Sequence, residues 1–493
     1  MVLGNLLHAI SEARNVVTVE PVLFLYMLGS FLQFIAVQQL LYFKVCVIKF
    51  NDTVMCNNLT MYKDEEKEVS SAASHWVIIL NLALTVPSVI SSLFLGSWSD
   101  TTGRRTVILL PTVGTIIYCC FLIVSASFIY TSVWIIIAAQ AILGVTGAYP
   151  ILTSAVFSYL GDITTKENRT VRFGILESMT FIGSSIGLFT SGFVIDNLGF
   201  VAVFIYIIIV EVLIVIYVLL WLRESVSQYG RFGIPERIED SVEADLGKVE
   251  KRRCVELFKV EHFVKSFSAV FRDRPQKRRL QVILLVICLF ILELVGTGER
   301  DTITFYVKKA PLAWNSTLIG VFSGARNLAK CLGLLGVLPL VHFLGLGDPI
   351  IAAGSTCFRM VGYIIIAFAR TTLVMFSAVA FMTFAGIPAA CTRAMLSKLV
   401  APSEQGSLFA FTAAMETITG FLGSLVFNAV YPATLDIIGG GLVYLLMAGL
   451  LVIPVALLIW VRYLKRYDDT YQIEEQPEEQ PEEDPPLTEE GSF

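Results

Sequence analysis

Two of the acidic residues inside the long apolar runs of this sequence occupy positions that suit proton transfer. At ~1.5 Å per residue, Glu177 lies roughly 10 Å from one end of its run, and Glu416 lies near the middle of another. A carboxyl group in a dry cavity favours its neutral form, so it can take up and release a proton near neutral pH. We therefore predict proton-coupling sites at Glu177 and Glu416. The alternative for Glu177 is a structural ion pair with a basic residue of another helix.

Three of the basic residues within apolar runs are candidates for substrate contact, because a charge there is costly unless it has a partner. Arg393 could bind an anionic substrate, or it could extend to the phosphates of lipid headgroups. Arg326 and Lys330 are i and i+4, so they share one face of a helix. In a cavity these two cations would favour a polyanion, whereas pairing with Glu293 and Glu416 would make them structural.

Further polar residues are candidates for contact with a substrate. Gln33 and Asn81 are amides within apolar runs, and they can hydrogen-bond either a substrate or a neighbouring helix. Glu299 and Asp301 lie near the outer end of their run, so we expect them to line the entrance to a central site.

A short charged loop at residues 95–105 joins two of the apolar runs. Two glycines let the chain reverse there, because glycine accepts backbone angles that other residues do not. Asp100 lies at a helix end, where it can accept hydrogen bonds from free N–H groups or pair with Arg104 or Arg105. The simplest interpretation is a charged turn that orients two helices. A second loop begins at Asp162, which we expect to pair with Arg169 or Arg172.

The elements that must position these residues are membrane-spanning helices. The chain has 493 residues, of which 55% are hydrophobic and 16% are charged, whereas about a quarter of a soluble protein is charged. The apolar runs have the length that crosses a bilayer core of roughly 30 Å. Lipid offers the backbone no hydrogen-bond partners, and runs of this length satisfy the backbone as helices. Residues 1–19 lack the pattern of a cleavable signal peptide.

Twelve apolar runs predict an all-α integral membrane protein with two six-helix bundles and a substrate path between them. The expected spans are 21–45, 76–97, 106–127, 131–158, 171–195, 200–222, 280–306, 317–342, 348–369, 371–396, 406–429 and 439–462. We divide the chain into an N-terminal segment (1–20), a first bundle (21–222), a basic linker (223–279), a second bundle (280–466) and an acidic tail (467–493). The composition of the tail predicts disorder.

The distribution of basic residues places the Asp100 loop, the linker and both termini in the cytoplasm. The loop at residues 45–74 is then outside, where Cys46 and Cys56 can form a disulfide. Three N-glycosylation sequons fall on the same outer face, at Asn51, Asn58 and Asn315. Neither terminus carries a clear lysosomal sorting motif, so we expect the plasma membrane rather than the lysosomal membrane.

Several classes of function are disfavoured by the motifs of the sequence. It shows no phosphate-binding loop, metal-ligand spacing or nucleophile arrangement, so we expect neither an ATP-driven pump nor an enzyme. We also expect no metal or cofactor other than a proton as coupling ion. The basic linker can contact anionic lipid headgroups, and it lacks the aromatic residues of a nucleic-acid surface. The acidic tail can bind a cytosolic partner, although a solvated tail is the simpler interpretation.

The Asp100 loop resembles the signature loop of the major facilitator superfamily, which acts there as a latch that is made and broken as the carrier rocks. More specific segments resemble the proton-coupled folate transporter family (solute carrier family 46). They include Ser74-His-Trp76, Leu176-Glu177, Arg393-Ala-Met-Leu-Ser-Lys398 and Glu404-Gln-Gly-Ser-Leu-Phe409. The resemblance implies inward transport of an organic anion with protons, favoured by acid pH. It also implies gating roles for Asp100, Arg104, Arg105 and Asp162.

The sequence departs from this family at two informative positions. Members that carry folate have a histidine at the position of Gly296, so the substrate here can differ. They have a cysteine at the position of Ala313, so Cys56 loses that partner and Cys46 becomes the candidate.

The sequence therefore predicts a secondary carrier with alternating access. The bundles rock around a central site, the Asp100 loop holds one state, and protonation of Glu177 permits return. The expected substrate is a folate-like organic anion, with a muropeptide or cyclic dinucleotide as the alternative. A membrane receptor or scaffold that kept the fold without transport is the alternative of a different class.

Overall fold

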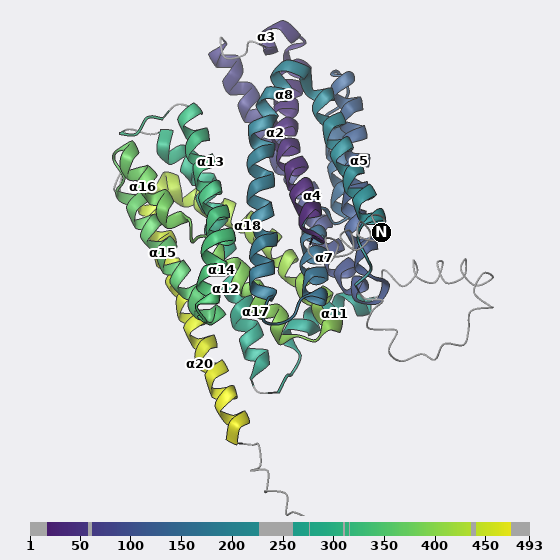
Figure 1. Cartoon of the computed structure of the whole chain (residues 1–493). Coiled ribbons are helices and arrows are strands. Elements are labelled where there is room, and N and C mark those ends of the chain that lie inside the picture. Colours follow the sequence, from purple (N-terminus) through teal and green to yellow (C-terminus); the bar gives the residue numbers. More distant parts are fainter. Residues whose placement is uncertain are drawn as a thin grey trace, which may run out of the picture.

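A computed structural model describes residues 17–57, 62–225, 260–275, 277–308, 311–314, 316–434 and 440–474. In this part of the chain, twelve helical segments are long and apolar enough to cross a membrane, as the sequence predicts. The protein is a multi-pass membrane protein built from two six-helix bundles, which stand side by side in Figure 1. Most of the basic linker and most of the acidic tail lie outside the described residues.

The first bundle forms six spans from six long or paired helices. α8 holds two of the spans, because Gly199 has a φ of 77° and bends the chain between them. α6 and α7 together make one span. The helices are α2 (Glu20–Phe50), α4 (Lys63–Thr102), α5 (Arg104–Ser127), α6 (Trp134–Val145), α7 (Ala148–Ile163) and α8 (Arg169–Leu220).

The second bundle is more broken, and three of its spans are assembled from shorter pieces. Its helices are α12 (Arg278–Lys308), α13 (Ser316–Leu332), α14 (Leu338–Phe343), α15 (Asp348–Phe368), α16 (Thr372–Met382), α17 (Ile387–Leu399), α18 (Gln405–Ala433), α19 (Leu442–Leu450) and α20 (Val452–Glu474). A π-helical turn, η2 (Gly333–Val337), joins α13 to α14, and a 3-10 turn, η3 (Pro402–Glu404), precedes α18. α20 continues past residue 467, where we predicted the tail to begin.

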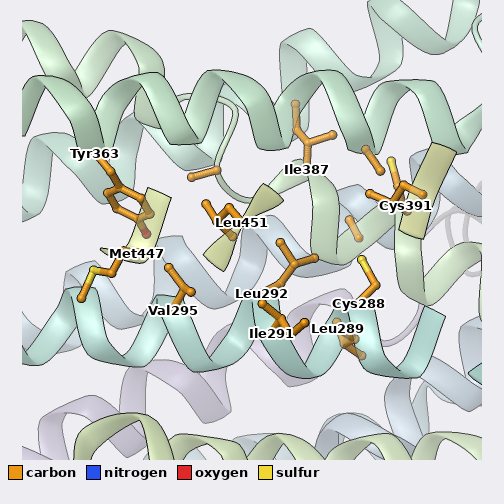
Figure 2. Close-up of a cluster of buried hydrophobic side chains, with 14 of the residues drawn as sticks. Cys288, Leu289, Ile291, Leu292, Val295, Tyr363, Ile387, Cys391, Met447 and Leu451 are labelled. Atoms are coloured by element: carbon orange, nitrogen blue, oxygen red, sulfur yellow. The ribbon is translucent and has the colours of Figure 1, made fainter. Parts of the chain in front are cut away.

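An apolar core holds the helices of the second bundle in place. Leu292 and Val295 of α12 pack in one buried cluster with Tyr363 of α15, Ile387 of α17 and Met447 of α19 (Figure 2). Burial of such side chains removes the freedom of each helix to rotate about its axis, because protein interiors are close-packed. The polar face of each helix is therefore fixed as well.

The two ends of the molecule are distinct. A disulfide between Cys46 and Cys56 joins the end of α2 to the short helix α3 (Thr53–Asn57), at the top of Figure 1. We call this the disulfide end. The turn between α4 and α5 at Gly103 lies at the opposite end, which we call the latch end.

A helix of the linker, α11 (Val260–Phe271), lies across the latch end. It packs against α4 of the first bundle and α18 of the second. Ser266 Oγ donates a hydrogen bond of 2.8 Å to the backbone oxygen of Leu93, and the Phe267 and Phe411 rings lie 5.3 Å apart. The linker thus contacts both bundles, which its charged composition did not indicate.

Candidate functional site

Arg393 is the centre of a buried cluster with three carboxylates. Its guanidinium contacts the carboxylate of Glu177, and its Nη2 lies 3.0 Å from Glu416 Oε1 and 3.5 Å from Glu293 Oε1. The guanidinium carbon also lies 5.0 Å from the centre of the Phe157 ring. The Arg393 side chain is 6% exposed, so it does not extend to lipid headgroups.

The Arg393 cluster draws on both bundles. Arg393, Glu293 and Glu416 belong to the second bundle, whereas Glu177 lies on α8 of the first. With all four groups ionised, the cluster carries two surplus negative charges, and such a surplus is costly in a buried site. Protons on the carboxylates remove the surplus, and a proton on Glu177 weakens the ionic contact between the bundles. This arrangement can link proton binding to separation of the bundles.

A second cluster surrounds Glu299 within the second bundle. Glu299 Oε1 lies 2.7 Å from Arg326 Nη1, and Glu299 Oε2 accepts a hydrogen bond of 2.8 Å from the Tyr363 hydroxyl. Arg359 Nη2 lies 3.8 Å from Glu299 Oε2, and Arg359 Nε donates to the Tyr363 hydroxyl at 2.9 Å. Lys330 also interacts electrostatically with Glu299. Three basic residues therefore surround one carboxylate, and with all four groups ionised this cluster has two surplus positive charges.

The surplus charges of the two clusters are equal and opposite. α12 carries Glu293 of the first cluster and Glu299 of the second less than two turns apart, and Glu293 interacts electrostatically with Arg359. Four carboxylates and four cations are thus balanced when all are ionised. An anion that entered this region would disturb the balance, and protons that entered with it would restore it.

One of the two alternatives for Arg326 and Lys330 was wrong, and so was the prediction for Glu299. Arg326 and Lys330 do not pair with Glu293 and Glu416; Glu299 is the acid beside them, while the other two acids contact Arg393. Glu299 does not line an entrance, because its side chain is fully buried. The reason is that Arg326 of α13 and Arg359 of α15 both lie beside Glu299 of α12, so the Glu299 carboxylate faces the interior of the bundle.

The Asp100 carboxylate joins the two bundles at the latch end. It accepts hydrogen bonds from the backbone N–H groups of Gly406 at 2.8 Å and Ser407 at 2.9 Å, and from the Ser407 hydroxyl at 2.7 Å. These N–H groups lie in the first turn of α18, where a helix leaves them without intrahelical partners. A negative charge is also favoured at a helix N-terminus. Asp100 of the first bundle therefore caps a helix of the second, and we call this contact the latch.

Arg104 holds the latch carboxylate in position. Its Nη1 lies 2.9 Å from Asp100 Oδ1 and its Nε lies 3.0 Å from Asp162 Oδ2, with only 1% of the Arg104 side chain exposed. Asp162 is thus the ion-pair partner of Arg104, which points inward from the start of α5 toward the end of α7. Of the two partners predicted for Asp162, Arg169 interacts with it electrostatically, and Arg172 pairs with Glu20 at 2.7 Å.

The other predicted gating residue, Arg105, lies outside this buried network. Its Nη2 donates to the backbone oxygen of Leu219 at 2.9 Å, at an exposed position. The Glu224 carboxylate accepts from the backbone N–H groups of Arg104 and Arg105 at 2.6 Å and 3.3 Å. Glu224 therefore caps α5, and Arg105 contributes to the turn rather than to the latch.

Further contacts at the latch end join the bundles. Arg169 Nη1 donates to the backbone oxygen of Ser397 at 2.9 Å, and Lys398 Nζ donates to Thr170 Oγ1 at 2.8 Å. The helices also approach closely, since a Cβ at Gly96 would lie 2.0 Å from the Ala410 Cβ. The bundles are thus tightly packed at this end.

The remaining predicted residues lie away from these clusters. Gln33 is half-buried and Asn81 is exposed, and neither contacts Arg393 or Glu299 through any hydrogen bond of the described residues. Asn51 is exposed, as a glycosylation site requires, while Asn58 and Asn315 lie outside the described residues. Glycosylation at these three positions stays a prediction.

A family model described as Major Facilitator Superfamily matches residues 19–309. The chain belongs to this superfamily. Two curated superfamily relatives agree with the resemblance seen in the sequence. The proton-coupled folate transporter of Bos taurus is 28% identical over 396 residues, which are 80% of each chain. The lysosomal proton-coupled steroid conjugate and bile acid symporter of Gallus gallus is 28% identical over 461 residues, covering 91% of this chain and 94% of the relative.

Solved structures of the major facilitator fold superpose on this one. The human organic anion transporter MFSD10 gives a TM-score of 0.65 at 17% identity, covering 89% of this chain and 98% of the other. The fucose:proton symporter FucP of E. coli gives a TM-score of 0.61 at 12% identity, covering 90% and 97%. At these identities the similarity establishes the shared fold.

Arg359 and Glu211 are among the buried charged residues of this superfamily member that sequence reasoning missed. Arg359 lies inside an apolar run, the same signal that singled out Arg326. Glu211 also lies inside an apolar run, and it is fully buried. Neither Glu211 oxygen has a hydrogen-bond partner among the described residues, and a Cβ at Gly29 would lie 3.6 Å from Glu211 Oε1. A buried carboxyl without a partner is held in its neutral form.

The latch geometry predicts the effect of substitutions at Gly406 and Asp100. A Cβ at Gly406 would lie 2.2 Å from Arg104 Nη1, so Gly406→Ala should force the bundles apart. Asp100→Asn should shift the ratio of closed to open latch ends by about tenfold or more, since a hydrogen bond to a charged group contributes about 1.5–3 kcal/mol. Spin labels at the exposed positions Lys166 and Ser403 should report a longer distance in both variants.

The matched control for the latch is Gly354→Ala, because a Cβ at Gly354 would meet nothing within 4 Å. It should keep the wild-type distance distribution. A wild-type distribution in Gly406→Ala as well would show that the latch does not hold the bundles together.

The isolation of Glu211 predicts that its charge is dispensable for stability. Glu211→Gln should leave the thermal unfolding temperature of the purified protein unchanged or raise it, because a neutral amide replaces a neutral acid. Glu20→Gln, which removes the 2.7 Å ion pair of Glu20 with Arg172, should lower it. A large drop in Glu211→Gln alone would reveal an ionised Glu211 with an essential partner.

Proposed function

We propose that this protein is a secondary carrier that moves an organic anion across the membrane together with protons, by alternating access. The observation that carries the proposal is the contact of Arg393 with Glu177 across the bundle interface and with Glu293 and Glu416 in its own bundle. A cation shared among three acids is a site that an anion can enter when protons neutralise the acids. No other cofactor is required.

The cycle begins with the latch closed and the acids able to take up protons. An anionic substrate binds near Arg393 as protons bind to the carboxylates, which keeps the buried charge balanced. With Glu177 neutral, the ionic contact between α8 and α17 is weakened, and the bundles can rock apart at the latch end. Release of substrate and protons on that side lets Arg393 and Glu177 pair again, so in this cycle the loss of the Glu177 proton, and not its uptake, permits return. Transport of the anion is therefore coupled to transport of protons. If either crossed alone, the buried groups around Arg393 would carry a charge without a counter-charge.

The relatives support this chemistry. One is named a proton-coupled folate transporter, and another is named a proton-coupled steroid conjugate and bile acid symporter. These are organic anions of different shape, so we take folate and steroid conjugates as the first substrate classes for this chain. Muropeptides and cyclic dinucleotides are the next classes.

We place the latch end in the cytoplasm and the disulfide end outside. Basic residues concentrate at the latch end, and a disulfide between Cys46 and Cys56 suits an oxidising compartment. The closed latch then seals the cytoplasmic side. We place the carrier in the plasma membrane; the lysosomal membrane, for which one relative is named, has the same orientation relative to the cytoplasm.

Substitution of Glu177 tests the coupling. In cells that express the wild-type chain, uptake of labelled folate or of a labelled steroid sulfate should be greater at about pH 5.5 than at about pH 7.4. Glu177→Gln cannot take up or lose the coupling proton, so acid-stimulated accumulation should fall about tenfold or more, equivalent to about 1.4 kcal/mol or more in the barrier. Exchange of internal for external substrate should persist.

Glu68→Gln is the matched control, because Glu68 is an exposed acid of the same bundle that pairs with Lys49 on the surface. It should transport as the wild type does. Glu177→Gln with normal surface abundance and normal acid stimulation would remove Glu177 from the coupling mechanism. If no tested anion is taken up at either pH, the receptor or scaffold alternative takes precedence.

A further inference from the structure

We propose that the cluster around Glu299 is a second anion subsite, which binds a substrate group that carries two negative charges close together. Phosphate monoesters and paired carboxylates have this chemistry. The proposal rests on the proposed function, since it names the class of anion that the carrier takes. The subsite is formed by Arg326, Lys330 and Arg359, with Glu299 as their single acidic partner.

The charge of this cluster is the first argument. The three basic residues are 5–9% exposed, and the one carboxylate among them is fully buried. With all four groups ionised, two positive charges therefore lack a counter-charge within the cluster, and buried charges require one. Glu293 supplies part of it from the Arg393 cluster, through its interaction with Arg359. When protons neutralise the acids around Arg393, that compensation is lost, and a doubly charged ligand would replace it.

Unused hydrogen-bond donors are the second argument. Arg326 Nε is buried without a hydrogen-bond partner among the described residues. In the same part of the chain, Lys330 Nζ makes no hydrogen bond and lies 5.6 Å from the centre of the Phe181 ring. A buried donor without an acceptor is costly, so Arg326 Nε is suited to an oxygen of a ligand. Lys330 Nζ can donate to the same ligand without giving up a hydrogen bond. An oxyanion with several acceptor oxygens satisfies both.

Lys330 also lies at the interface through which a ligand would arrive. Phe181 belongs to α8 of the first bundle, one turn beyond Glu177, so Lys330 of the second bundle faces the first bundle. The π-helical turn η2 begins three residues after Lys330, and such turns occur frequently at functional sites. Lys330 is therefore the member of the subsite that can most readily leave its present contact.

Gly296 allows Arg359 to approach α12 closely. A Cβ at this position would lie 3.3 Å from Arg359 Nη2, so the guanidinium rests against the bare backbone of α12. Arg359 Nη1 is 3.4 Å from the backbone oxygen of Leu292, which helps to hold it there. A larger residue at 296 would push Arg359 away from Glu299. Gly296 and Arg359 together therefore contribute to the preference of the subsite for a doubly charged substrate group.

Binding to the purified full-length chain tests the subsite with two matched pairs of probes. Folate ends in two carboxylates and pteroate in one; estrone phosphate carries close to two negative charges at about pH 7.4, and estrone sulfate carries one. The wild type should bind the doubly charged member of a pair about tenfold more tightly than its partner. Lys330→Gln and Gly296→Leu should remove most of this preference.

Two controls separate the subsite from folding and from general charge effects. Lys330→Arg keeps the charge and should keep most of the preference, whereas Arg370→Gln removes an exposed charge from the same bundle and should leave both affinities unchanged. Lys330→Gln should keep the wild-type unfolding temperature, because its Nζ makes no hydrogen bond.

The failures of the two proposals are distinguishable. If an anion is bound and taken up with protons, but the doubly charged member has no advantage or Lys330→Gln leaves that advantage intact, the subsite is overturned and the symporter stands. If no member of either pair binds the wild type, the subsite is overturned for these scaffolds. If uptake is also absent for every anion tested, the proposed function falls with it.

Discussion

A charge buried in a membrane protein must have a counter-charge, and this constraint organises the interior of the molecule. Arg393 has too many acids around it and Glu299 has too many cations. Neither cluster is stable as an isolated, fully ionised unit, yet together they are balanced. The interior is thus a single charge system divided between sites, and its two parts are linked through the short stretch of α12 between Glu293 and Glu299.

Because the charges are divided between the Arg393 and Glu299 clusters, an anion and a proton can influence each other's binding without direct contact. The anion acts on the cations and the proton acts on the acids, and each changes the environment of the other through the charge balance. The apolar core around Tyr363 and Leu292 keeps the helices in register while the charges are redistributed. The ion pair of Arg393 with Glu177 is the contact of this cluster that joins the two bundles. A change in the charge of Glu177 can therefore change how strongly the bundles are held together.

Much of this could be predicted from the sequence, because a charge in an apolar run is conspicuous. The twelve spans and the two bundles follow from the length and number of the apolar runs, and the charges within those runs singled out Glu177 and Arg393. Asp100 was singled out by its charged loop between two runs. The pairing of the charges did not follow, because partners such as Glu299 and Arg326 lie on different helices and their contact depends on how each helix is rotated. Side-chain direction at the start of α5 likewise decided that Asp162 meets Arg104.

Glu211 and Arg359 were missed for a different reason. Each carries the same signal as the residues that were noticed, and each lies in a run whose overall apolar character is strong. The depth of a charge in its helix is visible in a sequence, whereas the presence or absence of a partner is a property of the folded chain.

The geometry of the latch has a consequence for which positions of the sequence can change during evolution. Its acceptor is one carboxylate, but two of its three donors are backbone N–H groups of α18, which every residue except proline supplies. Replacement of Ser407 would therefore remove only its hydroxyl donor and keep the two backbone donors, whereas Gly406 has no room for a side chain. Selection on the gate should fall most strongly on Asp100, Arg104 and that glycine.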